Sequence, residues 1–485
     1  MQPRARCLVM LVSILCTAAA TAAEPAAASP QRRLVLCLDG TQNSPEQDID
    51  SYADGTKLFK PTNVLKTFRA IYPVHGGVSQ IAYYSEGVGS LIGEPTRFAA
   101  FAVFVDRFLG GAFGVGYEPR VKAAYRFLVA NYQPGDEIFV FGFSRGAAEA
   151  QTLARFVEWV GGVLPDKDVG GILKKEDEYY IPELYDGFKR SQMKPYSHEA
   201  PGKAQAVFKK IRDRRGGRPD VIGEPQPAQI EFLGVYDTVV SIGSRLAPDG
   251  EVTTVAEEYA YLVDKIPPKI VKTIRQALSI DERRWDFRPQ VWQPEDDSLA
   301  RSEALVQRWF PGVHSNVGGG FRYDGLADRA LAWMIDEANK AERHVAFDPD
   351  YLKNFTGQKR ACYEPSRPDS YTLLYRIAEA IRFKSGRGVR RLATWDQAGS
   401  WERSGLGFDK SVGELLISDC TYRPRNLLEY LAQHPERIAQ FPVPSAQQTE
   451  IREIVEDFKA RAGQRNPKPY HCRPPLPCGS VATSN

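Results

Sequence analysis

The sequence predicts an α/β fold built on a mainly parallel sheet with flanking helices, because strand-like runs alternate with helical segments along the chain. Strand-like runs occupy residues 34–38, 80–84, 138–143 and 230–236. The run at 138–143 is continuously apolar, as expected of a central strand covered on both faces. Between two of these runs, apolar side chains recur at the i, i+3, i+4, i+7 spacing of a helix, at Val121, Ala124, Tyr125 and Leu128.

Length and composition indicate a globular protein with a large core. The chain has 485 residues, of which 43% are hydrophobic and 25% charged, which fits one large domain with appendages or two domains. The formal net charge is +3, and no basic run carries interleaved aromatic residues. We therefore expect no nucleic-acid partner.

Residues 1–23 have the pattern of a secretory signal peptide. Arg4 and Arg6 form a positive start, Cys7–Cys16 an apolar core, and Thr17–Ala23 a small-residue stretch with cleavage options at its end. The alternative is an uncleaved anchor, for which the apolar core is short. We expect an exported protein, periplasmic or secreted.

Five cysteines remain after the signal peptide: Cys37, Cys362, Cys420, Cys472 and Cys478. Cys37 lies in an apolar strand and is expected to be a buried thiol. The other four could pair in an oxidising compartment, for example Cys362 with Cys420 and Cys472 with Cys478, although spacing does not decide the connectivity. No C-x-x-C pair, H-E-x-x-H motif or calcium loop is present, so we expect no metal and no cofactor.

The turn Gly142–Gly146, G-F-S-R-G, joins the apolar strand 138–143 to a predicted helix over residues 145–160. A G-x-S-x-G sequence between a strand and a helix is typical of a nucleophile elbow, where glycines leave room for a sharp backbone turn. The same spacing also occurs in plain turns. The strand–turn–helix context favours the elbow, so Ser144 is the predicted nucleophile.

A serine nucleophile needs a base and an acid that orients the base. Asp237 ends the strand 230–236 and would lie at the carboxyl edge of the sheet, where sites of open α/β sheets are found. His314 follows an apolar approach and precedes the run Gly318–Gly320. The chain order serine, aspartate, histidine is that of α/β-hydrolases, so Ser144, Asp237 and His314 are the candidate catalytic residues.

An ester carbonyl also needs backbone donors for its developing negative charge. One donor would be the amide of Arg145. The second would come from the loop after the strand 34–38, where Gly40 and Thr41 are the candidates; the alternative for this loop is a plain turn.

Together these motifs resemble the α/β-hydrolase catalytic domain of type VI secretion phospholipase effectors, over residues 32–345. The residues that carry the resemblance are Leu38–Thr41, Thr62–Val64, Tyr83–Tyr84, Gly87–Gly89, Gly142–Gly146, Gly234–Val239 and Phe310–Ser315. By this similarity Ser144, Asp237 and His314 map onto the family triad. The resemblance implies a serine esterase that cleaves carboxylic esters in lipids, of the phospholipase or lipase type.

Three features depart from that pattern. Asn316 stands where the family often has aspartate, and Gln276 stands where histidine is common; neither is a triad position. The signal peptide is the larger departure, because effectors of this kind normally carry none. It favours a resident periplasmic or exported enzyme over an injected effector.

Two further segments bear on organisation. Residues 165–229 form a charged, turn-rich insertion, either a cap or a surface excursion, and residues 346–485 form a C-terminal accessory region rich in prolines. The Phe-rich stretch 98–113 could line an acyl site, act as a lid or make transient contact with a lipid surface; the alternative is a buried core helix. Rival interpretations of the whole chain are an esterase or acyltransferase for non-lipid envelope esters and a hydrolase-like binding protein without turnover.

Overall fold

The structure is a computed structural model. It describes residues 32–40, 49–51, 57–59, 61–87, 113–165, 180–192, 201–214, 224–239, 265–284, 287, 289–321, 324–356, 390, 392 and 400–462. The predicted signal peptide at 1–23, Thr41 and almost all of the Phe-rich stretch 98–113 lie outside these residues.

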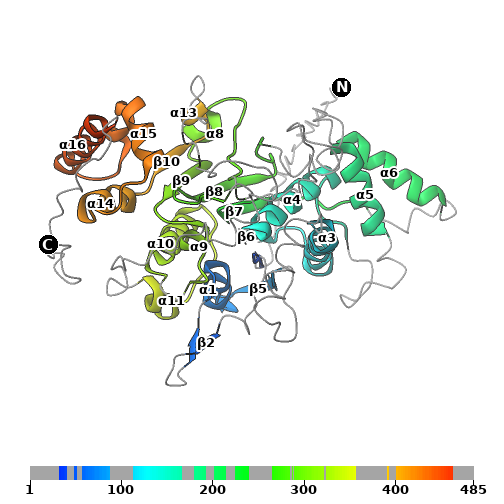
Figure 1. Cartoon of the computed structure of the whole chain (residues 1–485). Coiled ribbons are helices and arrows are strands. Elements are labelled where there is room, and N and C mark those ends of the chain that lie inside the picture. The colour runs from blue at the N-terminus through cyan, green and yellow to red at the C-terminus, as the bar shows by residue number, and fades with distance from the viewer. Residues whose placement is uncertain are drawn as a thin grey trace, which may run out of the picture.

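An eight-stranded sheet forms the centre of the molecule (Figure 1), with the strand order β10-β9-β8-β7-β6-β1-β5-β4. Its strands are β1 (Arg33–Leu38), β4 (Val74–His75), β5 (Val78–Ser85), β6 (Glu137–Phe143), β7 (Ile230–Tyr236), β8 (Val271–Ser279), β9 (Leu305–Phe310) and β10 (Leu406–Phe408). All neighbours are parallel except β4, which pairs antiparallel with β5. The predicted α/β class with a mainly parallel sheet is confirmed.

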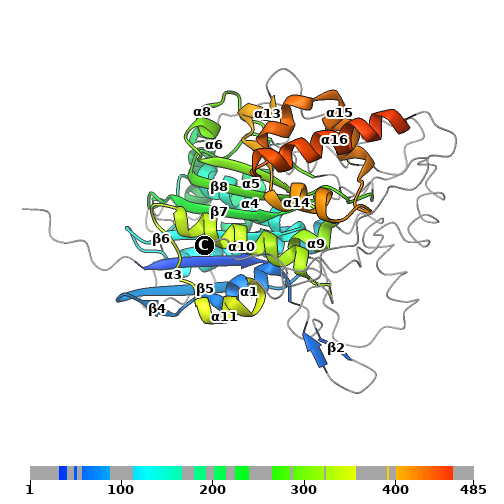
Figure 2. The same ribbon diagram turned by 90° about the vertical axis from the view of Figure 1, so that its left-hand side faces the viewer.

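Helices cover both faces of this sheet, because each central strand is apolar on both sides. Leu34 and Leu36 of β1 pack with α3 (Phe113–Asn131) and α4 (Arg145–Val160). Val35, between them, packs on the other face. There it meets α1 (Asn63–Ala70), α10 (Gly325–Lys340) and α11 (Pro349–Thr356). Figure 2 shows α1, α10 and α11 together along one side of the sheet.

The described part of the insertion 165–229 contains two helices, α5 (Tyr180–Gln192) and α6 (Pro201–Arg214). They pack on α3 and α4 (Figure 1). Tyr185 and Phe188 of α5 contact Phe156 near the end of α4, three turns along the helix from Ser144. The described helices therefore thicken the helical layer on this face.

The chain beyond residue 345 continues the same sheet. β10 pairs parallel with β9, and the remaining elements are α13 (Ser400–Arg403), α14 (Lys410–Ser418), α15 (Arg425–Gln433), η6 (Pro435–Gln440) and α16 (Ser445–Arg461). Trp309 of β9 shares a hydrophobic cluster with Leu415 and Leu428 of these helices. Figure 1 shows α14–α16 at the end of the molecule opposite α5 and α6. The short elements α8 (Ser298–Arg301), α9 (His314–Gly318) and the pair β2 (Ile49–Ser51) and β3 (Lys57–Phe59) complete the description.

Two cysteines fall within the described residues. Cys37 is a buried free thiol, as predicted. Cys420 is disulfide-bonded. The pairings drawn from Cys362, Cys472 and Cys478 lie outside the described residues and stay predictions.

Candidate active site

The three predicted catalytic residues follow three strands of one sheet. Ser144 comes directly after β6 and Asp237 directly after β7, which are neighbours, while His314 follows β9 by four residues. The carboxyl ends of parallel strands meet at one edge. All three side chains are buried there, with at most 7% of each residue exposed.

Ser144 occupies a strained backbone position between β6 and α4, with φ 57° and ψ −122°. A non-glycine residue in this region persists only where its surroundings hold it, often at functional sites. The flanking glycines are required by close backbone contacts. A Cβ on Gly142 would lie 2.6 Å from the carbonyl oxygen of Gly146, and a Cβ on Gly146 would lie 2.1 Å from that of Leu38.

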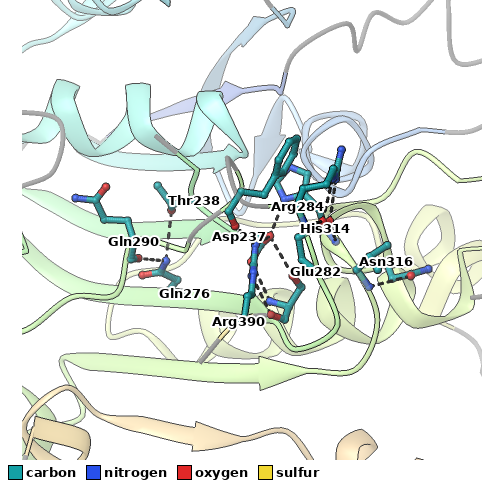
Figure 3. A network of polar contacts seen from close by, with 12 residues as sticks. Asp237, Thr238, Gln276, Glu282, Arg284, Gln290, His314, Asn316 and Arg390 are labelled. Atoms are coloured by element: carbon teal, nitrogen blue, oxygen red, sulfur yellow. Dashed lines mark hydrogen bonds and ion pairs between the residues drawn. The ribbon is translucent and has the colours of Figure 1, made fainter. Parts of the chain in front are cut away.

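Asp237 also has a positive φ, of 39°, and its carboxylate is fully enclosed by donors (Figure 3). Oδ1 accepts from the amide of Ser279 at 2.9 Å, and Oδ2 accepts from its hydroxyl at 3.2 Å. Arg390 binds both oxygens, at 2.6 and 2.9 Å. Oδ2 lies 2.6 Å from Nδ1 of His314.

These donors keep Asp237 ionised. Burial opposes ionisation, but the charge of Arg390 and the hydrogen bond with His314 hold the pKa of Asp237 well below its ordinary value of 3.8. An ionised carboxylate only accepts hydrogen bonds, so Nδ1 of His314 carries the proton. Nε2 of the neutral imidazole is then left as an acceptor.

His314 is the first residue of α9, and aromatic rings flank its imidazole. The ring centroid of Phe143 lies 4.7 Å away and that of Phe287 4.9 Å away. The His314 amide donates to Oε2 of Glu282 at 3.3 Å. Burial lowers the pKa of His314 below its usual 6.5, although the hydrogen bond that His314 donates to the Asp237 carboxylate opposes this shift. The imidazole is therefore neutral at pH 7, as a general base must be.

The structure thus brings Asp237 and His314 into direct contact. The backbone of Ser144 lies nearby, because its amide donates to the carbonyl of Tyr236, the residue before Asp237, at 3.0 Å. Within the described residues no hydrogen bond joins the Ser144 hydroxyl to the imidazole. Such bonds are often long in unliganded structures and tighten with substrate.

The loop after β1 lies against the elbow. A Cβ on Gly146 would also lie 2.5 Å from the carbonyl oxygen of Asp39. The amide of Gly40, a predicted oxyanion donor, here donates to Oδ1 of Asp39 at 2.7 Å. Arg145, the other predicted donor, is the first residue of α4, and Thr41 lies outside the described residues.

Asp39 organises this loop. Its Oδ2 accepts from the hydroxyl of Tyr84 at 2.7 Å and from that of Thr62 at 2.5 Å. Burial raises the pKa of Asp39 to about 6 in spite of these donors. Thr62 also caps the first turn of α1 by accepting from Leu65.

Three residues around the triad candidates were not predicted: Ser279, Glu282 and Arg390. Ser279 is the last residue of β8, and Glu282 follows three residues later. Had β8 been predicted, their place at the end of a strand would have marked them as candidates. Arg390 lies 153 residues from Asp237 and carries no motif.

The two departures from the family pattern have structural roles. Oδ1 of Asn316 accepts from the amide of Val313 at 3.1 Å and so closes the turn that holds His314. Gln276 is buried in β8 and donates to the carbonyl of Gln290 at 2.6 Å. Both stay outside the Asp237–His314 contact (Figure 3).

No group of three or more His, Cys, Asp or Glu side chains among the described residues could hold a metal ion. No helix in that part of the chain is both long and apolar enough to cross a membrane.

The fold is α/β with a mainly parallel sheet, and a family model relates the chain to known proteins. The model "T6SS, Phospholipase effector Tle1-like, catalytic domain" matches residues 32–337. The chain belongs to this family, which confirms the resemblance drawn from its motifs.

Individual relatives share a low sequence identity with this chain. The uncharacterized protein YEL023C of Saccharomyces cerevisiae is 27% identical over 301 residues, which cover 60% of this chain and 37% of the yeast protein. Among solved structures, an uncharacterized protein from Pseudomonas aeruginosa is 16% identical with a TM-score of 0.34, covering 88% of this chain and 62% of that one. The Tle1 effector bound to the VgrG spike of the type 6 secretion system is 18% identical with a TM-score of 0.27, covering 59% and 51%. The matched part of this chain spans only 37% of the length of the yeast protein.

Proposed function

We propose that the protein is a serine carboxylic-ester hydrolase acting on lipids, as a phospholipase or lipase, through Ser144, His314 and Asp237. The single observation that carries the proposal is the buried Asp237–His314 hydrogen bond of 2.6 Å, beside a serine with strained backbone at the edge of the same sheet. Family membership supports the lipid ester as substrate.

In the proposed reaction, Nε2 of His314 takes the proton of the Ser144 hydroxyl as Oγ attacks the ester carbonyl carbon. The imidazolium passes this proton to the leaving alcohol, and an acyl-enzyme remains on Ser144. His314 then deprotonates a water molecule, which attacks the acyl carbon and releases the acid, and Ser144 regains its proton. Asp237 stays ionised throughout and orients the imidazole.

The developing oxyanion would be bound by backbone amides, which contribute about 10²-fold or more in rate per donor. We propose the amide of Arg145, at the start of α4, as one donor. The loop of Gly40 and Thr41 is proposed to supply the second; for Gly40 this requires its amide to turn from Oδ1 of Asp39, to which it donates here. The position of the loop supports the proposal, because Leu38 and Asp39 touch Gly146 of the elbow.

We further propose the organisation expected from the sequence. A signal peptide at 1–23 exports the protein to the periplasm or beyond, a catalytic domain spans 32–345 with its insertion at 165–229, and a C-terminal region follows from 346 to 485. Contact with a lipid surface would be transient. The mass of the protein recovered from the periplasm tests the first point: a chain that keeps its first 22 or 23 residues contradicts cleavage.

Incubation with phospholipid vesicles tests the substrate class. We expect release of free fatty acid, detected by mass spectrometry, from the wild type and none from Ser144→Ala. Faster hydrolysis of short acetyl esters than of phospholipids would instead favour an esterase or acyltransferase for non-lipid envelope esters. An absence of turnover on every ester would favour a hydrolase-like binding protein.

A further inference from the structure

Arg390, which no sequence motif predicted, binds the candidate triad directly. Its guanidinium binds both carboxylate oxygens of Asp237, at 2.6 and 2.9 Å. It also donates to the carbonyl oxygens of Ser279 at 2.8 Å and of Phe287 at 2.6 Å. Only 2% of its side chain is exposed.

These four hydrogen bonds join three segments that surround the imidazole. Asp237 follows β7, Ser279 ends β8, and Phe287 packs edge-on against the ring of His314. A planar guanidinium suits this role because its donors have a fixed geometry that matches a carboxylate in two-point contact. Arg390 therefore fixes the position of the Asp237 carboxylate relative to the imidazole and the Phe287 backbone.

Arg390 also changes the charge around His314. The charged groups that act on the imidazole are Asp237 after β7 and Glu282 and Arg284 after β8. Arg390, from the C-terminal region, lies behind them: it binds Asp237 and also favours the ionised form of Glu282. Arg284 pairs with Glu282 at 2.8 Å, and Asp281 beside it accepts from the amide of Gly312. Asp237 and Arg390 thus form a neutral pair, as do Glu282 and Arg284.

We propose that Arg390 is a positioning residue for the catalytic reaction, which holds Asp237 against His314 and offsets its negative charge. The proposal rests on the proposed function of Ser144, Asp237 and His314. Arg390 lies beyond residue 337, where the match to the catalytic-domain family ends. The C-terminal region of this chain therefore completes an active site that the matched domain alone leaves without its central cation.

Two substitutions separate the geometric effect of Arg390 from its charge. Arg390→Lys keeps the charge but loses the two-point contact, so kcat should fall by about 10²-fold, the cost of small displacements at a reacting centre. KM and the acid limb of the pH–activity profile should stay in place. Arg390→Gln removes the charge, so the imidazolium gains stability and the acid limb should move to higher pH by about one unit.

Arg275→Lys is the matched control. Arg275 is a buried arginine of β8 that pairs with Glu337 and donates to the carbonyls of Ile274 and Glu303. It lies outside the catalytic residues, so its replacement reports the general cost of losing a buried guanidinium. We expect wild-type kcat for Arg275→Lys, and a Tm lowered to a similar extent in both lysine variants.

Wild-type kcat in Arg390→Lys, or an unmoved acid limb in Arg390→Gln, would overturn the proposal. If the glutamine variant does not fold, kcat of the lysine variant against its control decides alone. The imidazole titration of His314, followed by NMR and assigned with His314→Ala, tests the charge effect without turnover. If the wild type cleaves no ester but the pKa of His314 rises in Arg390→Gln, the proposed function is contradicted. The effect of the Arg390 charge on His314 is then still supported.

Discussion

Nδ1 of His314 lies 2.6 Å from Oδ2 of Asp237, although 77 residues separate the two in the chain. The contact is buried on all sides: Asp237 is fully enclosed and His314 is 5% exposed. Asp237 also accepts hydrogen bonds from Ser279 and Arg390. Its carboxylate therefore cannot turn away from the imidazole without losing them. The orientation of His314 is therefore held before any substrate binds, which is the arrangement that general-base catalysis needs.

Asp237→Asn should reduce kcat by about 10³- to 10⁴-fold, because the amide no longer selects the tautomer with Nε2 free. The substitution also leaves Arg390 without its carboxylate, so Tm should fall as well. Steady-state kinetics on a soluble ester, together with thermal unfolding, measure both effects. A folded variant with wild-type kcat would show that Asp237 does not orient the base.

Gly146→Ala should damage the elbow, because the added Cβ would lie 2.1 Å from a backbone oxygen that cannot move aside cheaply. We expect a loss of stability of about 1–3 kcal/mol, typical of overpacking, and much slower reaction of Ser144. Gly413→Ala in α14 is the control, since its Cβ would meet side-chain carbons and no backbone atom: Ile451 at 3.1 Å, and Phe441 and Val443 at 3.3 Å. Equal Tm and equal rates in the two variants would rule out a steric requirement at Gly146.

Glu282→Gln tests how much the ionised carboxylate of Glu282, which accepts from the His314 amide, contributes to stability. Burial opposes ionisation of Glu282, but the Arg284 guanidinium holds its pKa at about 2, below the ordinary 4.5. A depressed carboxyl pKa contributes stability that is present above pH 4.5 and lost as the pH falls toward 2. The variant should lose at most about 3 kcal/mol of unfolding free energy at pH 7.

Urea unfolding across the acid range checks the sign of this effect. The difference in unfolding free energy between wild type and Glu282→Gln should become steadily smaller as the pH falls below 4.5. A difference that stays constant with pH would mean that Glu282 acts through shape and hydrogen bonding alone.

The central strands were predictable because their residues are apolar without interruption. The runs that became β1, β5, β6 and β7, and the helices α3 and α4, are confirmed. The strands β8 and β9 were not predicted, because Arg275 and Gln307 interrupt their apolar runs. In the structure these side chains are buried with partners: Arg275 pairs with Glu337, and Gln307 donates to the carbonyls of Trp292 and Ser404. Such partners come from distant segments that no local pattern reveals.

The same distinction applies to the site. Ser144, Asp237 and His314 could be proposed from sequence because their signals are local: Ser144 and Asp237 follow predicted strands, and His314 precedes a run of glycines. Arg390 could not, because its role depends on where the C-terminal region meets the sheet. Their assignment as a catalytic triad stays a proposal that chemistry must test.

The most direct test is the intact mass of the protein without residues 1–23 after exposure to a fluorophosphonate ester, compared with Ser144→Ala treated alike. An activated serine attacks phosphorus, displaces fluoride and keeps a single stable phosphonyl adduct. We predict one adduct on the wild type and none on Ser144→Ala. A folded wild type without an adduct, or an adduct that persists in Ser144→Ala, would contradict the assignment of Ser144 as the nucleophile.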